Sequence, residues 1–143
     1  MNVDVMFSSE TNEWSTPQYL FEQLNNEFNF TLDPCATDEN KKCENHFTKE
    51  DDGLSRSWKD ETVFCNPPYG RQIGKWVKKA YEETKDENTK VVMLIPSRTD
   101  TKYFHDYIYE ICEVRFLKGR VYFEKGGKKV GRAPFPSMVV VFN

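Results

Sequence analysis

Residues 66–69, Asn66-Pro67-Pro68-Tyr69, combine groups that can act chemically on an amino group. The β-branched and aromatic run before them, residues 62–65, predicts a buried strand. The two prolines must end that strand, because neither can donate to a ladder or enter a helix interior. An amide side chain, a proline carbonyl and an aromatic ring are therefore expected together at the carboxyl edge of a sheet, where open α/β folds bind ligands.

An amide oxygen and a free carbonyl on a rigid turn can accept two hydrogen bonds from one planar amino group. Tyr69 can stack on the flat ring that carries this group. The arrangement suits an exocyclic amine on a heterocycle, or an amide nitrogen, that must be made nucleophilic. Taken alone, the same residues also fit an ordinary proline-stopped turn, with Asn66 satisfied and Tyr69 packed.

Length and composition favour one globular domain over residues 1–143, without a separate target-recognition domain. The 38% hydrophobic and 15% aromatic content is typical of a folded chain. A net charge of −3 argues against a general polyanion binder. No apolar run approaches the roughly 20 residues that span a bilayer, and the polar amino terminus is no signal peptide. We therefore expect a cytoplasmic protein that does not bind membranes.

The chain has four cysteines, Cys35, Cys43, Cys65 and Cys112. In an intracellular protein these are expected to be thiols and not a disulfide framework. Cys35, Cys43 and His46 lack the paired Cys-x-x-Cys spacing of a zinc site. The sequence therefore predicts no metal.

Residues 1–13 form a polar arm, after which Thr16 and Pro17 predict the cap and first position of a helix. Residues 30–33 alternate like a strand that stops at Pro34, which places the Asp33 carboxylate at a strand end. Residues 37–61 are charged and weakly periodic, with one possible turn of helix over 44–47.

Periodicity in the second half predicts strands alternating with helices. The expected elements are a helix from residue 73, where apolar residues repeat at helical spacing, a strand over 91–95, a helix over 100–111, and strands over 114–117, 120–123 and 138–142. The residues that repeat in the first helix are Ile73, Trp76, Val77, Ala80 and Tyr81, and the second helix is expected to bury Phe104, Tyr107, Ile108 and Ile111. Lysines on the first of these helices are read as a solvated face. The pattern indicates an α/β sandwich with an antiparallel addition at the carboxyl end.

Residues 124–132 form a basic loop between the last strands of an otherwise acidic chain. The segment can be a solvated hairpin tip without a function, or a loop that contacts nucleic-acid phosphates. The candidate nucleic-acid contacts are Lys118, Arg120, Lys128, Lys129 and Arg132.

Short motifs follow one another along nearly the whole chain. They are Met6-Phe7-Ser8-Ser9, Trp14-x-Thr16-Pro17, Asp33-Pro34-Cys35-Ala36, Asp52-Gly53-Leu54 with Trp58, Asn66-Pro67-Pro68-Tyr69, Ile95-Pro96-Ser97-Arg98-Thr99-Asp100-Thr101, Gly119-Arg120 and Ala133-Pro134-Phe135-Pro136-Ser137. In this order they resemble the small phage-type DNA N-6-adenine-methyltransferases related to the Dam type. The tetrapeptide resembles the catalytic motif of amino-methyltransferases that use S-adenosylmethionine.

The resemblance implies a compact, Rossmann-like methyltransferase fold, mostly a parallel sheet with an antiparallel carboxyl-terminal strand. It implies S-adenosylmethionine as cofactor, held by Trp14, Thr16, Asp33, Ala36, Asp52 and Leu54. The chain departs from larger amino-methyltransferases because no glycine-rich turn follows the first predicted strand. The small side chain of Ala36 is expected to leave the backbone accessible there instead.

The resemblance also implies double-stranded DNA as partner and a catalytic set of Asn66, Pro67, Pro68 and Tyr69. The target adenine must leave the duplex, since its amino group is out of reach inside the stack. Phe135 is a candidate second wall of the base pocket, or else ordinary core. Competing functions are methylation of RNA or of a protein glutamine, and non-catalytic nucleic-acid binding. The biological role, protection of DNA from restriction or regulation, stays open.

Overall fold

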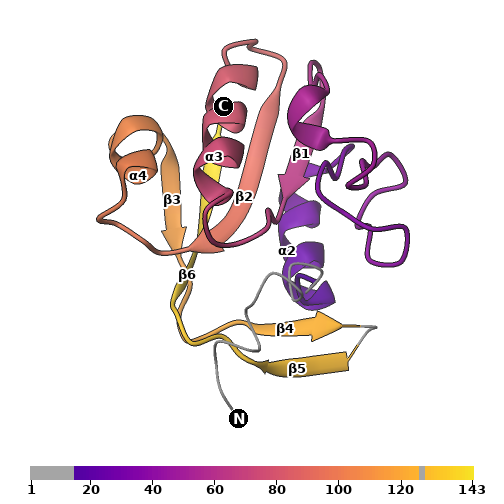
Figure 1. Ribbon diagram of the computed structural model, residues 1–143, viewed down its shortest axis with the longest axis vertical. Helices are drawn as coiled ribbons and strands as arrows, with labels where there is room; N and C mark the ends of the chain where they lie inside the picture. Colours follow the sequence, from indigo (N-terminus) through magenta and orange to yellow (C-terminus); the bar gives the residue numbers. More distant parts are fainter. Residues whose placement is uncertain (1–14, 126–127) are drawn as a thin grey trace.

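The computed structural model describes residues 15–125 and 128–143 (Figure 1). The predicted arm and Trp14 lie outside these residues. The elements are α2 (Gln18–Phe28), η2 (Gly53–Ser55), β1 (Thr62–Cys65), α3 (Ile73–Glu83), β2 (Lys90–Pro96), α4 (Lys102–Tyr107), β3 (Glu113–Phe116), β4 (Tyr122–Lys125), β5 (Lys128–Arg132) and β6 (Ser137–Phe142). Helices and strands are mixed along the chain, which confirms the predicted α/β class.

The main sheet has the strand order β1-β2-β6-β3. β1 and β2 are parallel, whereas β6 is antiparallel to both of its neighbours, β2 and β3. The last strand is therefore antiparallel, as predicted, but the prediction of mostly parallel pairing is wrong. Most pairs are antiparallel because β6 lies between β2 and β3. This one reversed strand makes two antiparallel pairs, although β1, β2 and β3 share one direction.

The sequence predicted a basic loop over residues 124–132, whereas in the structure β4 and β5 form a second, two-stranded sheet from the described residues of this region. β4 and β5 pair antiparallel, with a register shift between Phe123 and Glu124. The strands form because Phe123 is fully buried and Val130 packs against the same apolar cluster, which gives the hairpin an inner face. Figure 1 shows this hairpin at one end of the main sheet.

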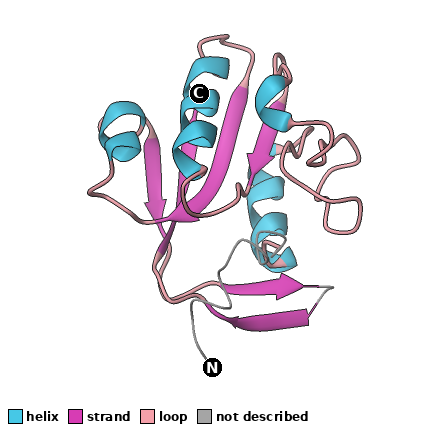
Figure 2. Ribbon diagram, in the orientation of Figure 1, coloured by secondary structure: helices cyan, strands magenta, loops and turns pink. Residues whose placement is uncertain are grey.

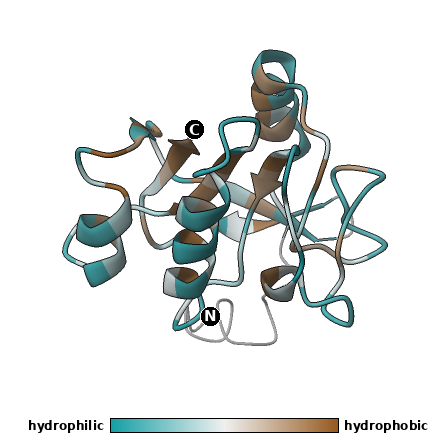
Figure 3. Cartoon of the chain, turned by 90° about the horizontal axis from the view of Figure 1, so that it is seen from above, coloured by the Kyte–Doolittle hydropathy of each residue, from teal (hydrophilic) through white to brown (hydrophobic). Residues whose placement is uncertain are grey.

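Two apolar clusters cover the two faces of the main sheet. α3 and α4 pack on the face that carries Val91, Met93 and Ile95 of β2. α2 and the hairpin pack on the face that carries Val92 and Leu94. Viewed from above, the strands between the helices are brown and the outer helix surfaces largely teal (Figure 3). Residues on both faces of β2 are buried, as its continuous apolar run predicted.

The predicted helices are confirmed in place, with corrections at their ends. The Thr16 hydroxyl does not cap α2, since Pro17 is the N-cap and no side chain caps it by a hydrogen bond. α4 is shorter than the predicted 100–111, and Ile111 is 54% exposed and not buried. The chain has left the helix by then, because Glu110 adopts a left-handed backbone at φ 61°.

The segment between α2 and β1 is mostly loop (Figure 2). The predicted strand over 30–33 is reduced to isolated parallel bridges, from Leu32 to Val63 and from Asp33 to His46. The turn of helix suggested over 44–47 is absent, since His46 takes part in one of these bridges. Within the described residues, no helix is long and apolar enough to cross a membrane.

Candidate active site

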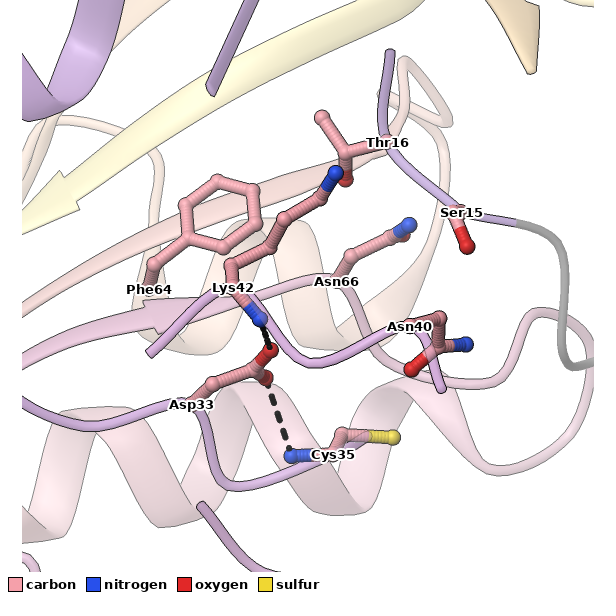
Figure 4. A pocket seen from close by; sticks show the side chains of 8 residues that line it. All are labelled: Ser15, Thr16, Asp33, Cys35, Asn40, Lys42, Phe64 and Asn66. Carbon is pink, nitrogen blue, oxygen red and sulfur yellow. Dashed lines mark hydrogen bonds between the residues drawn. The ribbon is translucent and has the colours of Figure 1, made fainter. Parts of the chain in front are cut away.

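A cavity lies beside the carboxyl end of β1 (Figure 4). The empty space within it is about 290 Å³, counted out to its open mouth. It is lined by the segment before α2, the loop after Leu32, and β1 with the residue that follows it. The lining residues are Ser15, Thr16, Asp33, Cys35, Asn40, Lys42, Phe64 and Asn66.

Asn66 follows β1 directly, and its side-chain oxygen is buried without a hydrogen-bond partner among the described residues. Leaving a buried acceptor unpaired costs about 1–3 kcal/mol, so such an atom needs an explanation. The same part of the chain gives the Pro67 carbonyl no backbone N–H donor. Because Pro67 and Pro68 restrict the backbone, both acceptors stay in place for a ligand.

Thr16 is 1% exposed, and its hydroxyl also has no partner within residues 15–125 and 128–143. The preceding residue, Ser15, pairs with Glu124 of the hairpin through two backbone hydrogen bonds of 2.7 and 3.0 Å. These bonds fix the segment before α2 over the cavity. Because the Thr16 hydroxyl does not cap α2, it is available to the cavity, which Thr16 lines together with Asn66.

Asp33 is 4% exposed and accepts hydrogen bonds from two backbone N–H groups, those of Lys42 at 2.9 Å and Cys35 at 3.4 Å. Burial raises the pKa of this carboxyl to about 6, although both backbone hydrogen bonds and the nearby His46 and Lys42 oppose the rise. The carboxylate is therefore ionised at neutral pH and buried, which suits it to bind a cation.

A second turn supports the turn that follows Asp33. A Cβ atom on Gly53 would lie 2.1 Å from the Pro34 carbonyl oxygen, so only glycine permits this approach. The indole N–H of Trp58 donates to the Gly53 carbonyl at 3.0 Å, and Trp58 stacks on Trp76 at 6.2 Å. The Asp52-Gly53-Leu54 motif therefore lies against the cavity wall.

Three residues predicted to bind cofactor do not line this cavity. Asp52 is exposed in a left-handed conformation at φ 57°, and Leu54 is half-buried against the core. Ala36 is half-buried, and its N–H donates to the Phe47 carbonyl at 3.1 Å. Thr16 and Asp33, by contrast, are brought together with Asn66.

Tyr69 is fixed on the face of the sheet that carries α2. Its hydroxyl donates to the Leu94 carbonyl at 3.3 Å, and burial raises its pKa well above the usual value. Its ring lies edge-to-face with Phe123 at 5.8 Å and with Phe135 at 5.7 Å. Tyr69 and Phe135, the two predicted walls of a base pocket, are thus in contact, and Phe135 is also part of the apolar core.

The predicted nucleic-acid contacts all lie on the hairpin or on the segment leading to it. Lys118, Arg120, Lys128, Lys129 and Arg132 are exposed. The Lys129 ammonium lies 5.5 Å from the ring centroid of Tyr122, an exposed aromatic residue on the paired strand. The hairpin therefore combines positive charge with an aromatic surface.

Five of the described lining residues were not predicted from the sequence to belong to the site: Ser15, Cys35, Asn40, Lys42 and Phe64. Strand alternation could have found Phe64, because it lies two residues before Asn66. No periodic signal marks Asn40 or Lys42, which belong to the irregular loop. All four cysteines are free thiols, and the described residues contain no metal-binding group of His, Cys, Asp or Glu.

The model of one protein family, DNA N-6-adenine-methyltransferase (Dam), matches residues 5–143 of the chain. This match spans the cavity, the tetrapeptide and the hairpin. The chain therefore belongs to the DNA N-6-adenine-methyltransferase (Dam) family.

Individual relatives agree with the family. The chain is 30% identical over 139 residues to the DNA N-6-adenine-methyltransferase of Haemophilus phage HP1, covering 94% of the chain and 80% of that protein. It is 31% identical over 122 residues to the enzyme of the same name from Escherichia phage T1, covering 84% of the chain and 50% of that protein. A putative methyltransferase of Escherichia coli, YfdM, is 34% identical over 64 residues, 40% of the chain and 70% of that protein.

Proposed function

We propose that the chain methylates the N-6 amino group of adenine in double-stranded DNA, with S-adenosylmethionine as methyl donor. The observation that carries this proposal is the unpartnered, buried amide oxygen of Asn66 on a proline-braced strand end. Family membership supports the reaction class, and the relatives from phages T1 and HP1 bear its name.

The residues around the cavity suit the methionine end of this cofactor. The Thr16 hydroxyl and the Asp33 carboxylate are buried oxygen acceptors, as an ammonium group requires. When bound, S-adenosylmethionine supplies an electrophilic methyl group. Asp52 and Leu54 are proposed to act from the supporting turn, near the adenosine part, and Trp14 and Ala36 to complete the site.

Asn66 and Pro67 would orient the nucleophile. The Asn66 oxygen and the Pro67 carbonyl accept the two hydrogens of the adenine amino group, which directs its lone pair out of the base plane. Tyr69 and Phe135 provide aromatic walls for a base that has left the duplex, and Pro68 keeps the turn rigid. Burial keeps the Cys65 thiol protonated, so no covalent nucleophile is assigned.

The sheet supports a Rossmann-like methyltransferase fold. β1, β2 and β3 run in one direction, and the Leu32–Val63 bridge adds a short parallel pairing beside β1. Asp33 and Asn66 lie just beyond the carboxyl ends of these neighbouring segments, which is where α/β sheets bind ligands. The exposed cations of the hairpin are proposed to contact DNA phosphates.

The proposal is tested by transfer of labelled methyl from S-adenosylmethionine to unmethylated DNA, RNA and a protein extract, followed by nucleoside analysis. Label is expected in DNA as N-6-methyladenine. Asn66→Ala should lower kcat roughly 100- to 1,000-fold, by analogy with the loss of one preorganised hydrogen-bonding group. Cofactor affinity and thermal stability serve as controls and should change little. Label confined to RNA or protein, or undiminished activity in Asn66→Ala, would refute the proposal.

A further inference from the structure

Lys42 is a lining residue to which the proposed chemistry gives no role. Its side chain runs past Phe64 in the direction of Thr16 (Figure 4). Its backbone N–H donates to Asp33 at 2.9 Å, so the same carboxylate that lines the cavity also fixes Lys42 beside it. Among the described residues that line the cavity, it is the one with a cationic side chain.

In residues 15–125 and 128–143, the Lys42 ammonium has one hydrogen-bond acceptor. It donates to the neutral amide oxygen of Gln18 at 2.8 Å and lies 5.9 Å from the ring centroid of Phe21. An ammonium has three donors, and the ion pairs found within the described ranges do not include Lys42. Burial lowers its pKa, opposed by Glu124, Asp33 and Glu22. The hydrogen bond to Gln18 is exposed, so the ammonium can also reach a ligand at the mouth of the cavity, and a carboxylate there would give it a charged partner.

The cavity thus presents acceptors and a cation within one small space. Thr16 and Asp33 suit an ammonium group, and Lys42 suits a carboxylate. An α-amino acid carries these two charges on one carbon. We infer that Lys42 binds the α-carboxylate of the methionine end of S-adenosylmethionine, so that the cavity recognises an amino-acid zwitterion. This inference rests on the proposed function.

The test compares two ligands, S-adenosylmethionine and its decarboxylated form, which lacks only the group assigned to Lys42. Affinities are measured by calorimetry for the wild type, Lys42→Met and Lys42→Arg. Lys41→Met is the matched control, because Lys41 is adjacent in sequence but pairs with Glu44 at 3.3 Å and does not line the cavity.

Lys42→Met should weaken S-adenosylmethionine binding roughly ten- to hundredfold, the worth of a hydrogen bond to a charged group. Its affinity for the decarboxylated ligand should stay within about threefold of the wild type, which also reports that the site is folded. Lys42→Arg and Lys41→Met should keep the preference for the carboxylate. If Lys42→Met lost affinity equally for both ligands, or bound S-adenosylmethionine as the wild type does, the role of Lys42 would be refuted and the proposed function would not be affected. A wild type that binds neither ligand would overturn the proposed function with it.

Discussion

Replacing Gly53 by alanine tests whether the turn at 52–54 holds the cavity wall in place. The added Cβ would lie 2.1 Å from the Pro34 carbonyl oxygen and 3.1 Å from Cη2 of Trp76. Real Cβ contacts are essentially never shorter than 3.0 Å, so the two turns must separate by about 1 Å. Neither neighbour yields easily, because one is backbone and the other is a buried, stacked indole.

Such overpacking costs about 1–3 kcal/mol. For a domain of this size the melting temperature falls by about 3 °C per kcal/mol, so Gly53→Ala should lower it by roughly 3–9 °C. Because Pro34 follows Asp33, displacement of this turn should also weaken cofactor binding. Thermal unfolding followed by circular dichroism and calorimetric titration with S-adenosylmethionine measure the two effects.

Gly74→Ala is the matched control. Its Cβ would meet the Tyr103 ring at 3.7 Å, an ordinary contact, and it lies within α3. Alanine in place of a helical glycine should therefore stabilise the protein by about 0.5–1 kcal/mol and leave cofactor affinity unchanged. A Gly53→Ala variant with the melting temperature and the cofactor affinity of the wild type would show that this turn does not hold the cavity wall in place.

Two further predictions concern charge. Because the ionised Asp33 carboxylate is assigned to the cofactor ammonium and its pKa is raised to about 6, affinity should fall roughly tenfold per pH unit below pH 6. Stability depends on pH in the opposite direction to affinity. The contribution of Asp33 to the free energy of unfolding decreases as pH rises from 3.8 to about 6. Calorimetry across pH 4.5–7.5 checks the binding trend, and Asp33→Asn should abolish it; a flat wild-type profile would contradict the assignment. Neutralising Lys128, Lys129 and Arg132 should weaken DNA binding and reduce the slope of log affinity against log salt by about 3. Fluorescence anisotropy measures that slope, with Lys75→Ala/Lys78→Ala on exposed positions of α3 as control; an unchanged slope in the hairpin variant would show that these cations are merely solvated.

The strands and helices with strong periodicity could be predicted from sequence. β2 is a continuous apolar run that ends at Pro96, and α3 places Ile73, Trp76, Val77 and Ala80 on one buried face. Strand order was not accessible, because the pattern of β6 carries no information on which neighbours it pairs with. More parallel strand pairs were therefore predicted than the sheet contains.

The candidate site was predictable where a residue follows a strand. Asn66 and Asp33 were found because proline ends each preceding segment. Lys42 was not found, because its place depends on a backbone hydrogen bond to Asp33 and on an irregular loop. For Thr16, the local sequence predicted a helix cap and the family resemblance a cofactor contact, because local sequence alone cannot tell a capping hydroxyl from one that lines a cavity.

The position of β6 has a consequence for how the chain acquires its structure. β6 follows β1, β2 and β3 in sequence, yet it pairs with both β2 and β3 inside the sheet, and all six of its residues are buried. The main sheet cannot be completed before residues 137–142 have been synthesised, because until then the edge of β2 that pairs with β6 has no partner. An unpaired strand edge of this kind favours aggregation, so insertion of β6 is the step that removes this hazard from the main sheet.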